Sequence, residues 1–213
     1  MKPSINIIKS SMATYLLTVI LLCITSITCK RDEPIPVESI NIQIPNGDFE
    51  NWSWVPLPEN WKTNSYPLSM AQWVTYIVKK DSQVVYHGAY SMKLIYNLTP
   101  PAWGAAPAWA KNKFAISEHP NNLRGYLKCN LQGTDTVSIS VKILNNGITV
   151  DSGQWKSTVS IINWTEVNIP ISNSSTVIDS ALITITGGKY KDSTTTLANS
   201  TTFWVDQLYL IKY

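Results

Sequence analysis

The feature that most constrains the fold of this chain is a two-residue alternation of apolar and polar side chains. It is clearest in segment 137–143, where valine and isoleucine alternate with serine and lysine. Alternate side chains of a strand point to opposite faces, so the pattern predicts a strand with one buried face. Asn145, Asn146 and Gly147 follow, and these residue types supply the positive φ angles of a tight turn before a second run at 148–150. The sequence therefore predicts a β-hairpin here.

Similar alternation predicts further strands at 90–96, 167–171 and 181–185, and two more strands are expected at 73–79 and 83–86. The last segment, 203–210, is apolar on both faces, which predicts a strand covered on both sides. No segment shows a sustained helical period. Many short strands without interleaved helices predict an all-β sandwich or barrel.

The first residues have the pattern of a targeting segment. Lys2 and Lys9 form a basic start, and an uncharged stretch follows up to Cys29. Its densest apolar part, 15–24, is shorter than the roughly 20 residues of a membrane-spanning helix. The residues before Cys29 resemble a loose bacterial lipobox, which predicts cleavage after Thr28. An uncleaved anchor helix and a simple secretory signal are the alternatives.

Cleavage at this point defines the expected domain organisation. Residues 1–28 form the lipoprotein signal peptide, and residues 29–44 form a lipidated Cys29 and an extended tether. The charged residues 30–33 resemble the surface-export signal of lipoproteins from glycan-foraging Gram-negative bacteria. Residues 45–213 form one domain of ordinary size. We therefore expect a cell-surface lipoprotein of the outer membrane, held there by its lipid anchor only.

The charge of the mature chain is nearly balanced. Removal of residues 1–28 takes away Lys2 and Lys9 and no acid, so the formal net charge falls from +3 to +1. No basic stripe is visible along the sequence, and nucleic-acid binding requires clustered Lys and Arg. We therefore expect no nucleic-acid partner. Cys129 would be the one thiol left, so no structural disulfide is expected.

Several motifs occur in an order that resembles a known family. They are PNGDFENW (45–52), HGAYSMKL (87–94), PNNLRGYLKC (120–129), VSISVKI (137–143), NWTEVNIPI (163–171), DSALITI (179–185) and FWVDQLYL (203–210). The order resembles bacterial surface lipoproteins that carry a carbohydrate-metabolism domain, similar to jelly-roll carbohydrate-binding modules. This resemblance covers residues 45–213. It implies a two-sheet antiparallel jelly-roll β-sandwich of the galactose-binding-like kind, with the first and last motifs as its first and last strands.

The resemblance also implies a structural calcium ion where the first and last strands meet. Glu50 and Asp206 would be its side-chain ligands, and Asp48 or Asn46 could add oxygens to the six to eight that Ca²⁺ takes. Gln207 stands where the family often has a second acid, which lowers the ligand charge. The alternative is that Asp48 and Glu50 accept hydrogen bonds from nearby amides in a turn.

Nine tryptophans against three phenylalanines point to a possible carbohydrate surface, because a flat indole suits the apolar face of a sugar ring. Trp103 and Trp109 lie in PPAWGAAPAWA (100–110), which predicts a surface loop. Carbohydrate contact is one interpretation of these two residues, and burial under a folded-back loop is the other. Trp54 and Trp155 are further carbohydrate-binding candidates. Structural roles are expected for Trp61, Trp164 and Trp204.

No catalytic motif is present. The chain lacks GxSxG, HExxH, a phosphate-binding glycine loop and a dinucleotide fingerprint. A glycosidase needs two carboxylates about 5 to 10 Å apart, and sequence cannot pair them. We therefore expect a non-enzyme that binds a polysaccharide or oligosaccharide and presents it to partner surface glycan-utilisation proteins. A structural or adhesion lipoprotein with a protein partner is the alternative, and a hydrolase is the third hypothesis.

Overall fold

The computed structural model describes residues 39–54, 57–65, 77–96, 107–172, 177–188 and 200–213. These residues lie in one compact unit, Glu38–Tyr213. The expected signal segment, the lipidation site Cys29 and the candidate Trp103 lie outside the described residues. Within the described ranges, no helix is long and apolar enough to cross a membrane.

The described elements are all strands. They are β1 (Ile40–Gln43), β2 (Lys62–Thr63), β3 (Val78–Asp81), β4 (Ser91–Tyr96), β5 (Ala108–Ala115), β6 (Asn122–Asn130), β7 (Val137–Asn145), β8 (Ile148–Ser157), β9 (Ile161–Pro170), β10 (Ser180–Gly187) and β11 (Thr201–Lys212).

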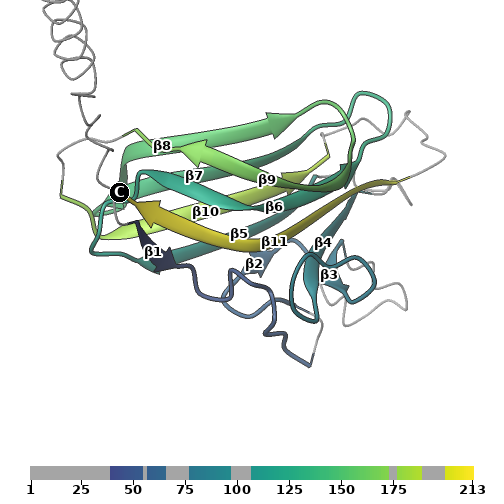
Figure 1. The fold of residues 1–213 in the computed structure, drawn as a ribbon, viewed down its shortest axis with the longest axis horizontal. Helices are drawn as coiled ribbons and strands as arrows, with labels where there is room; N and C mark the ends of the chain where they lie inside the picture. Colours follow the sequence, from purple (N-terminus) through teal and green to yellow (C-terminus); the bar gives the residue numbers. More distant parts are fainter. Residues whose placement is uncertain (1–38, 55–56, 66–76, 97–106, 173–176, 189–199) are drawn as a thin grey trace, which may run out of the picture. The chain divides into compact units, whose positions relative to one another are not determined.

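The strands form two antiparallel sheets (Figure 1). The six-stranded sheet has the order β3-β4-β11-β6-β9, with β1 also paired to β11, and the five-stranded sheet has the order β2-β5-β10-β7-β8. Neighbouring strands mostly come from distant parts of the chain, so consecutive strands often cross between the sheets. This arrangement is a jelly-roll β-sandwich, and it confirms the predicted fold class.

The predicted hairpin is confirmed as β7 and β8. Asn146 and Gly147 have φ angles of 50° and 81°, as the turn requires. Strands are also confirmed at β4, β9 and β10, which cover the predicted segments near 90–96, 167–171 and 181–185. Their inward residues form one core between the sheets, which includes the fully buried Ile139 and Ile183.

Strand β11 lies inside the six-stranded sheet and is covered on both faces, as predicted. Phe203 and Val205 face the core, and Leu208 takes over the inward direction after an irregularity between Asp206 and Tyr209. Gln207 has a φ of 51° at this point. The extra residue reverses which side chains of β11 point inwards after this position. Asp206, just before it, lies on the outer side of the sheet and is nevertheless fully buried.

Two sequence predictions are wrong. The motif at 45–52 is not the first strand: Asn46 and Phe49 have positive φ angles and form a turn, while β1 lies earlier, in residues assigned to the tether. Segment 83–86 is not a strand either. The Asp81 carboxylate accepts hydrogen bonds from the amides of Gln83 and Val84, which bends the chain directly after β3.

Candidate functional site

The loop between β3 and β4, residues 82–90, is held by two carboxylates from opposite ends of the domain. Asp206 Oδ2 accepts hydrogen bonds from the amides of Tyr86 at 3.0 Å and His87 at 3.1 Å. Glu50 Oε1 accepts from the next amides along the loop, those of Ala89 at 2.9 Å and Tyr90 at 3.2 Å. The first and last signature motifs therefore meet at this loop, which we call the seam.

Gly88 allows the loop to lie this close to Glu50. Its φ is +81°, and a Cβ atom built on it would lie 2.2 Å from Glu50 Oε1. The backbone conformation favours glycine, and a Cβ atom there would force the Glu50 carboxylate to move. His87 and Gly88 are thus both part of the seam.

Burial raises the pKa of Asp206 to about 6. The amides of His87, Tyr86 and Gln207 act in the opposite direction, because they stabilise the carboxylate, and the charge of Glu50 adds to the rise. The two acids are therefore close enough to interact electrostatically. The seam holds negative charge in a buried place and compensates it with backbone dipoles.

The predicted calcium ligands come together only in part, and their surroundings suit amides. Asp206 Oδ1 accepts from the Gln207 amide, while Asn46 donates to the carbonyls of Asn51 and Glu59. Asp48 Oδ1 accepts a hydrogen bond from the Glu50 amide at 3.4 Å. For Asp48 this agrees with the alternative interpretation, in which the two acids accept from nearby amides in a turn. In the described part of the chain, no three His, Cys, Asp or Glu residues gather as a metal-binding group.

This donor set does not fit a calcium ion as it is placed. An N–H group that points at a carboxylate oxygen presents positive charge where a cation would have to sit, and Ca²⁺ needs six to eight oxygens. Glu50 and Asp206 each direct an oxygen at two such groups. We therefore expect no calcium ion at these residues while the amides keep these positions, and metal analysis tests this expectation.

Three aromatic rings gather on the outer face of the six-stranded sheet, beside the seam. Tyr86, from the seam loop, stacks on Tyr126 of β6 with ring centroids 3.6 Å apart and an interplanar angle of 13°. Trp164 of β9 lies edge-on to Tyr86 at 6.0 Å. Tyr86 remains 43% exposed. We call these three residues the aromatic cluster.

Polar side chains surround the aromatic cluster on the same face. Glu166 lies directly opposite Tyr126 across the strands, and Arg124 lies opposite Asn168. Arg124 contacts both, with Nη1 3.8 Å from Glu166 Oε1 and Nε 3.4 Å from Asn168 Oδ1. A hydrogen bond with the Tyr86 side chain, together with burial and the charge of Glu166, raises the pKa of Tyr126 to about 12. Tyr126 therefore stays protonated and able to donate.

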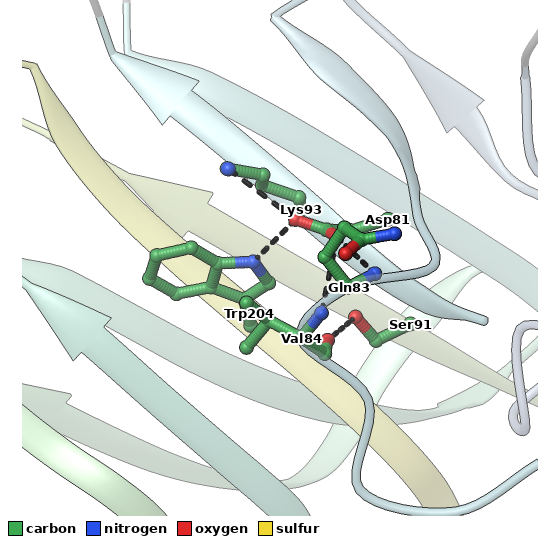
Figure 2. Close-up of polar contacts among 6 residues, drawn as sticks. All are labelled: Asp81, Gln83, Val84, Ser91, Lys93 and Trp204. Carbon is green, nitrogen blue, oxygen red and sulfur yellow. Dashed lines mark hydrogen bonds and ion pairs between the residues drawn. The ribbon is translucent and has the colours of Figure 1, made fainter.

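A second polar group fixes the start of the seam loop (Figure 2). Asp81 Oδ2 accepts from Trp204 Nε1 at 2.9 Å and pairs with Lys93 Nζ at 3.3 Å. Burial alone would raise the pKa of Asp81, but the hydrogen bonds from Trp204, the Gln83 and Val84 amides and Lys93 lower it to about 2. Ser91 donates to the Val84 carbonyl at 2.6 Å. Trp204 is thus structural, as predicted.

Among the predicted carbohydrate-binding tryptophans, Trp109 and Trp155 do not lie together. Trp109 is not on a loop, because it lies in β5, where Lys111 Nζ is 4.7 Å from its ring centre. Trp155 lies in β8, an edge strand of the same sheet, and packs against the core. Trp54 is 96% exposed. Trp103 lies outside the described residues.

Sequence reasoning missed two of the three cluster residues and assigned the third to a structural role. Tyr86 was placed in a strand, and Tyr126 was one outward position among many in an alternating segment. Trp164 packs on the outer face and not in the core, whereas Trp61 is structural as predicted: its Nε1 donates to the Asn46 carbonyl at 3.0 Å. The sequence signal that could have indicated the cluster is an aromatic residue at a strand position that faces away from the core.

No protein-family model matches the chain, and no curated protein matches it. Solved structures do. A cyclase from Fischerella sp. TAU is 11% identical, with 82% of this chain and 97% of that chain covered and a TM-score of 0.50. The mannan-recognising carbohydrate-binding module TmCBM27 is 13% identical over 83% of this chain and 99% of its own, with a TM-score of 0.47.

A third structure is TmCBM61 in complex with β-1,4-galactotriose, at 12% identity, 78% and 95% coverage and a TM-score of 0.44. The chain resembles jelly-roll carbohydrate-binding modules in fold. Identities of this size show the fold alone, and the ligands of these proteins do not transfer with it. The function has to be argued from this chain's own surface.

Proposed function

We propose that this protein is a non-catalytic glycan-binding domain whose ligand lies on the aromatic cluster. The observation that carries the proposal is the half-exposed ring of Tyr86, stacked on Tyr126 and flanked by Trp164. Tyr126 covers part of the Tyr86 ring, and 43% of Tyr86 stays exposed. In this proposal the exposed part of Tyr86 takes the apolar face of a sugar ring, to which aromatic side chains offer a large flat contact area.

The surroundings of the cluster supply the polar part of such a site. Arg124, Glu166 and Asn168 provide donors and acceptors within the same strands, as sugar hydroxyls require. The seam adds rigidity, because Asp206 holds the backbone of Tyr86 itself. A positioned aromatic ring loses little conformational entropy when a ligand binds.

The carboxylates near the cluster support a binding role over catalysis. Asp206 and Glu50 are occupied by backbone amides, and Glu166 is 3.8 Å from Arg124. A glycosidase would need one carboxyl to donate a proton and another to attack or activate water across the same bond. Turnover of a bound glycan would contradict this part of the proposal.

The proposal also includes a lipid anchor at Cys29, which would hold the domain on the outer surface of the outer membrane. Residues 30–33 support it by their resemblance to a surface-export signal. Anchoring would raise the effective concentration of bound glycan near partner surface proteins. Mass spectrometry of the mature N-terminus tests it, since an acylated cysteine is expected and a soluble chain starting elsewhere would exclude it.

The binding proposal is tested by affinity electrophoresis against neutral plant, host and microbial polysaccharides. We expect Tyr86→Ala to lose retention on the glycan that the wild type binds, with a change in stability of about 1 kcal/mol or less, as for a surface residue. Trp54→Ala and Trp109→Ala are the matched aromatic controls and should retain binding. Loss confined to either control would move the site to that residue. Retention of Tyr86→Ala would refute the cluster.

The protein-partner alternative is a separate outcome of the same series. If no polysaccharide is retained and a pull-down from cell-surface proteins recovers a partner whose capture survives Tyr86→Ala, the protein is an adhesion or structural component instead.

A further inference from the structure

The other sheet presents a basic surface that the sequence did not reveal. The outward positions of β2, β5, β7 and β8 carry five exposed lysines. They are Lys62, Lys111, Lys113, Lys142 and Lys156. We call these residues the lysine face. They are scattered along the chain between positions 62 and 156, so no basic stripe appears in the sequence.

Strand register places these lysines in adjacent rows. Lys62 is the direct cross-strand partner of Lys111, so the two lie about 5 Å apart at the backbone. Lys113 and Lys142 occupy one row on either side of Leu182. Lys156 lies opposite Ser138 in another row. Like charges held directly opposite one another destabilise a sheet, so this arrangement has a cost that a bound anion would remove.

Neutralising charges are scarce on this face. None of the outward positions of β2, β5, β10, β7 and β8 is Asp or Glu. Among the described ion pairs none involves these five lysines. Asp179, one residue before β10, interacts electrostatically with Lys113, but its carboxylate already accepts from Ser180 and the Asn146 amide. The lysine face is therefore a concentrated positive surface on a nearly neutral domain.

We infer that the lysine face is a second binding surface, which takes an anionic polysaccharide with uronate or sulfate groups. Hydroxyl side chains lie between the lysines, with Thr184 beside Lys111 and Ser140 next in the same row. Hydroxyls suit sugar hydroxyls, and ammonium groups suit carboxylates or sulfates spaced along a chain. The surface is independent of the aromatic cluster, because the two lie on opposite sheets.

The form of the face favours an extended glycan over other polyanions. A broad sheet surface cannot enter a groove of duplex DNA, where helices or two-stranded ribbons are read. Anchoring on lipid headgroups is helped by exposed apolar side chains that insert. The apolar outward residues Leu182 and Trp109 are only half-exposed, and Lys111 lies over the ring of Trp109. An extended anionic chain can cross several strands and meet one lysine after another.

The test compares two variants with the same charge change. The triple variant K62S/K111S/K142S removes three lysines from the face, and K79S/K80S/K212S removes three lysines elsewhere. Binding of polygalacturonate and chondroitin sulfate is measured by titration at low and physiological salt. We expect the first variant to bind at least about tenfold more weakly, the control to bind like the wild type, and wild-type binding to fall with salt.

Three outcomes would overturn the inference. They are no binding of either polymer by the wild type, equal losses in the two triple variants, and equal or tighter binding of duplex DNA or of phosphatidylglycerol vesicles. Tyr86→Ala separates the two proposals. If Tyr86→Ala abolishes retention on neutral glycans and still binds the anionic polymers, the two surfaces act independently. If the wild type binds no neutral polysaccharide but does bind the anionic polymers, only the aromatic-cluster proposal fails.

Discussion

Gly88 shows at the scale of one residue how the seam is built. Its positive φ and its missing side chain let the loop amides of Ala89 and Tyr90 reach Glu50. Gly147, in the turn between β7 and β8, has the same φ of +81°, but a Cβ there would meet nothing within 4 Å. Substitution at Gly147 therefore tests the positive φ alone, whereas substitution at Gly88 tests the positive φ together with a clash against Glu50.

Replacing these glycines by alanine should give unequal losses of stability. Gly147→Ala pays for the left-handed backbone only, about 1 kcal/mol. Gly88→Ala also pushes against the Glu50 carboxylate, so we expect at least about 2 kcal/mol and weaker glycan retention, since Tyr86 is displaced. Urea unfolding measures both. Equal losses would show that Glu50 moves away without cost.

Asp206 should make the domain more stable as the solution becomes mildly acidic. Its pKa is about 6 in the folded state against an ordinary 3.8, so the folded protein binds the proton more tightly than the unfolded chain. The free energy of unfolding should therefore rise as pH falls from about 7 to about 4, by up to roughly 3 kcal/mol from this group.

Urea unfolding of the wild type and of Asp206→Asn over this pH range checks the sign. The variant should lack the rise, whatever its absolute stability. Asp48→Asn, which removes an exposed acid from the motif at 45–52, should keep the rise. An Asp206→Asn profile parallel to that of the wild type would assign the pH dependence to other groups.

At the scale of one element, β11 joins most of the site together. Its irregularity at Gln207 lets Phe203 and Val205 pack inwards before it and Leu208 after it, while Asp206 and Trp204 face outwards. Trp204 lies directly opposite Lys93 on one neighbouring strand and Lys128 on the other. Their ammonium groups are 4.7 Å and 5.9 Å from its ring centre. The strand thus positions the seam loop from both ends.

The hydrogen bond from Trp204 to Asp81 should be measurable as a coupling energy. Trp204→Phe removes the donor, so the pKa of Asp81 should rise from about 2 towards its ordinary value. A double-mutant cycle with Asp81→Asn should give about 1 to 2 kcal/mol of coupling at neutral pH, as for a hydrogen bond to a charged group. The coupling should be lost as pH falls through about 2, where the wild-type carboxylate protonates. No coupling at pH 7 would mean that water replaces the indole.

At the scale of the whole molecule, the loop amides join Glu50 and Asp206 at the seam, in the place where a metal ion was expected. With this arrangement a metal ion is not needed to hold the two motifs together. We therefore expect the same melting temperature with excess calcium and with chelator. A fall of several degrees in chelator, equivalent to 1 kcal/mol or more for a domain of this size, together with one calcium per chain by metal analysis, would contradict this. The seam amides would then have to turn away from Glu50 and Asp206.

The strands of this protein were largely predictable because alternation is a local property. The hairpin at 137–150, the strands β4, β9 and β10 and the two-sided covering of β11 all follow from side-chain period and turn chemistry. Errors arose where a polar side chain bends the backbone, as Asp81 does after β3, and where a short strand such as β1 gains its partner from the other end of the chain. A third error arose in the Pro- and Ala-rich run 100–110, which hid the start of β5 at Ala108.

Sequence by itself determined the all-β class, the turn glycines and the two acids that meet at the seam. Only the tertiary structure decided what these residues do. Strand pairing between distant segments brings Tyr86 onto Tyr126, gathers five lysines on one sheet and separates Trp109 from Trp155. The physical reason is that alternation fixes which face a side chain takes, whereas its neighbours on that face depend on which strands pair.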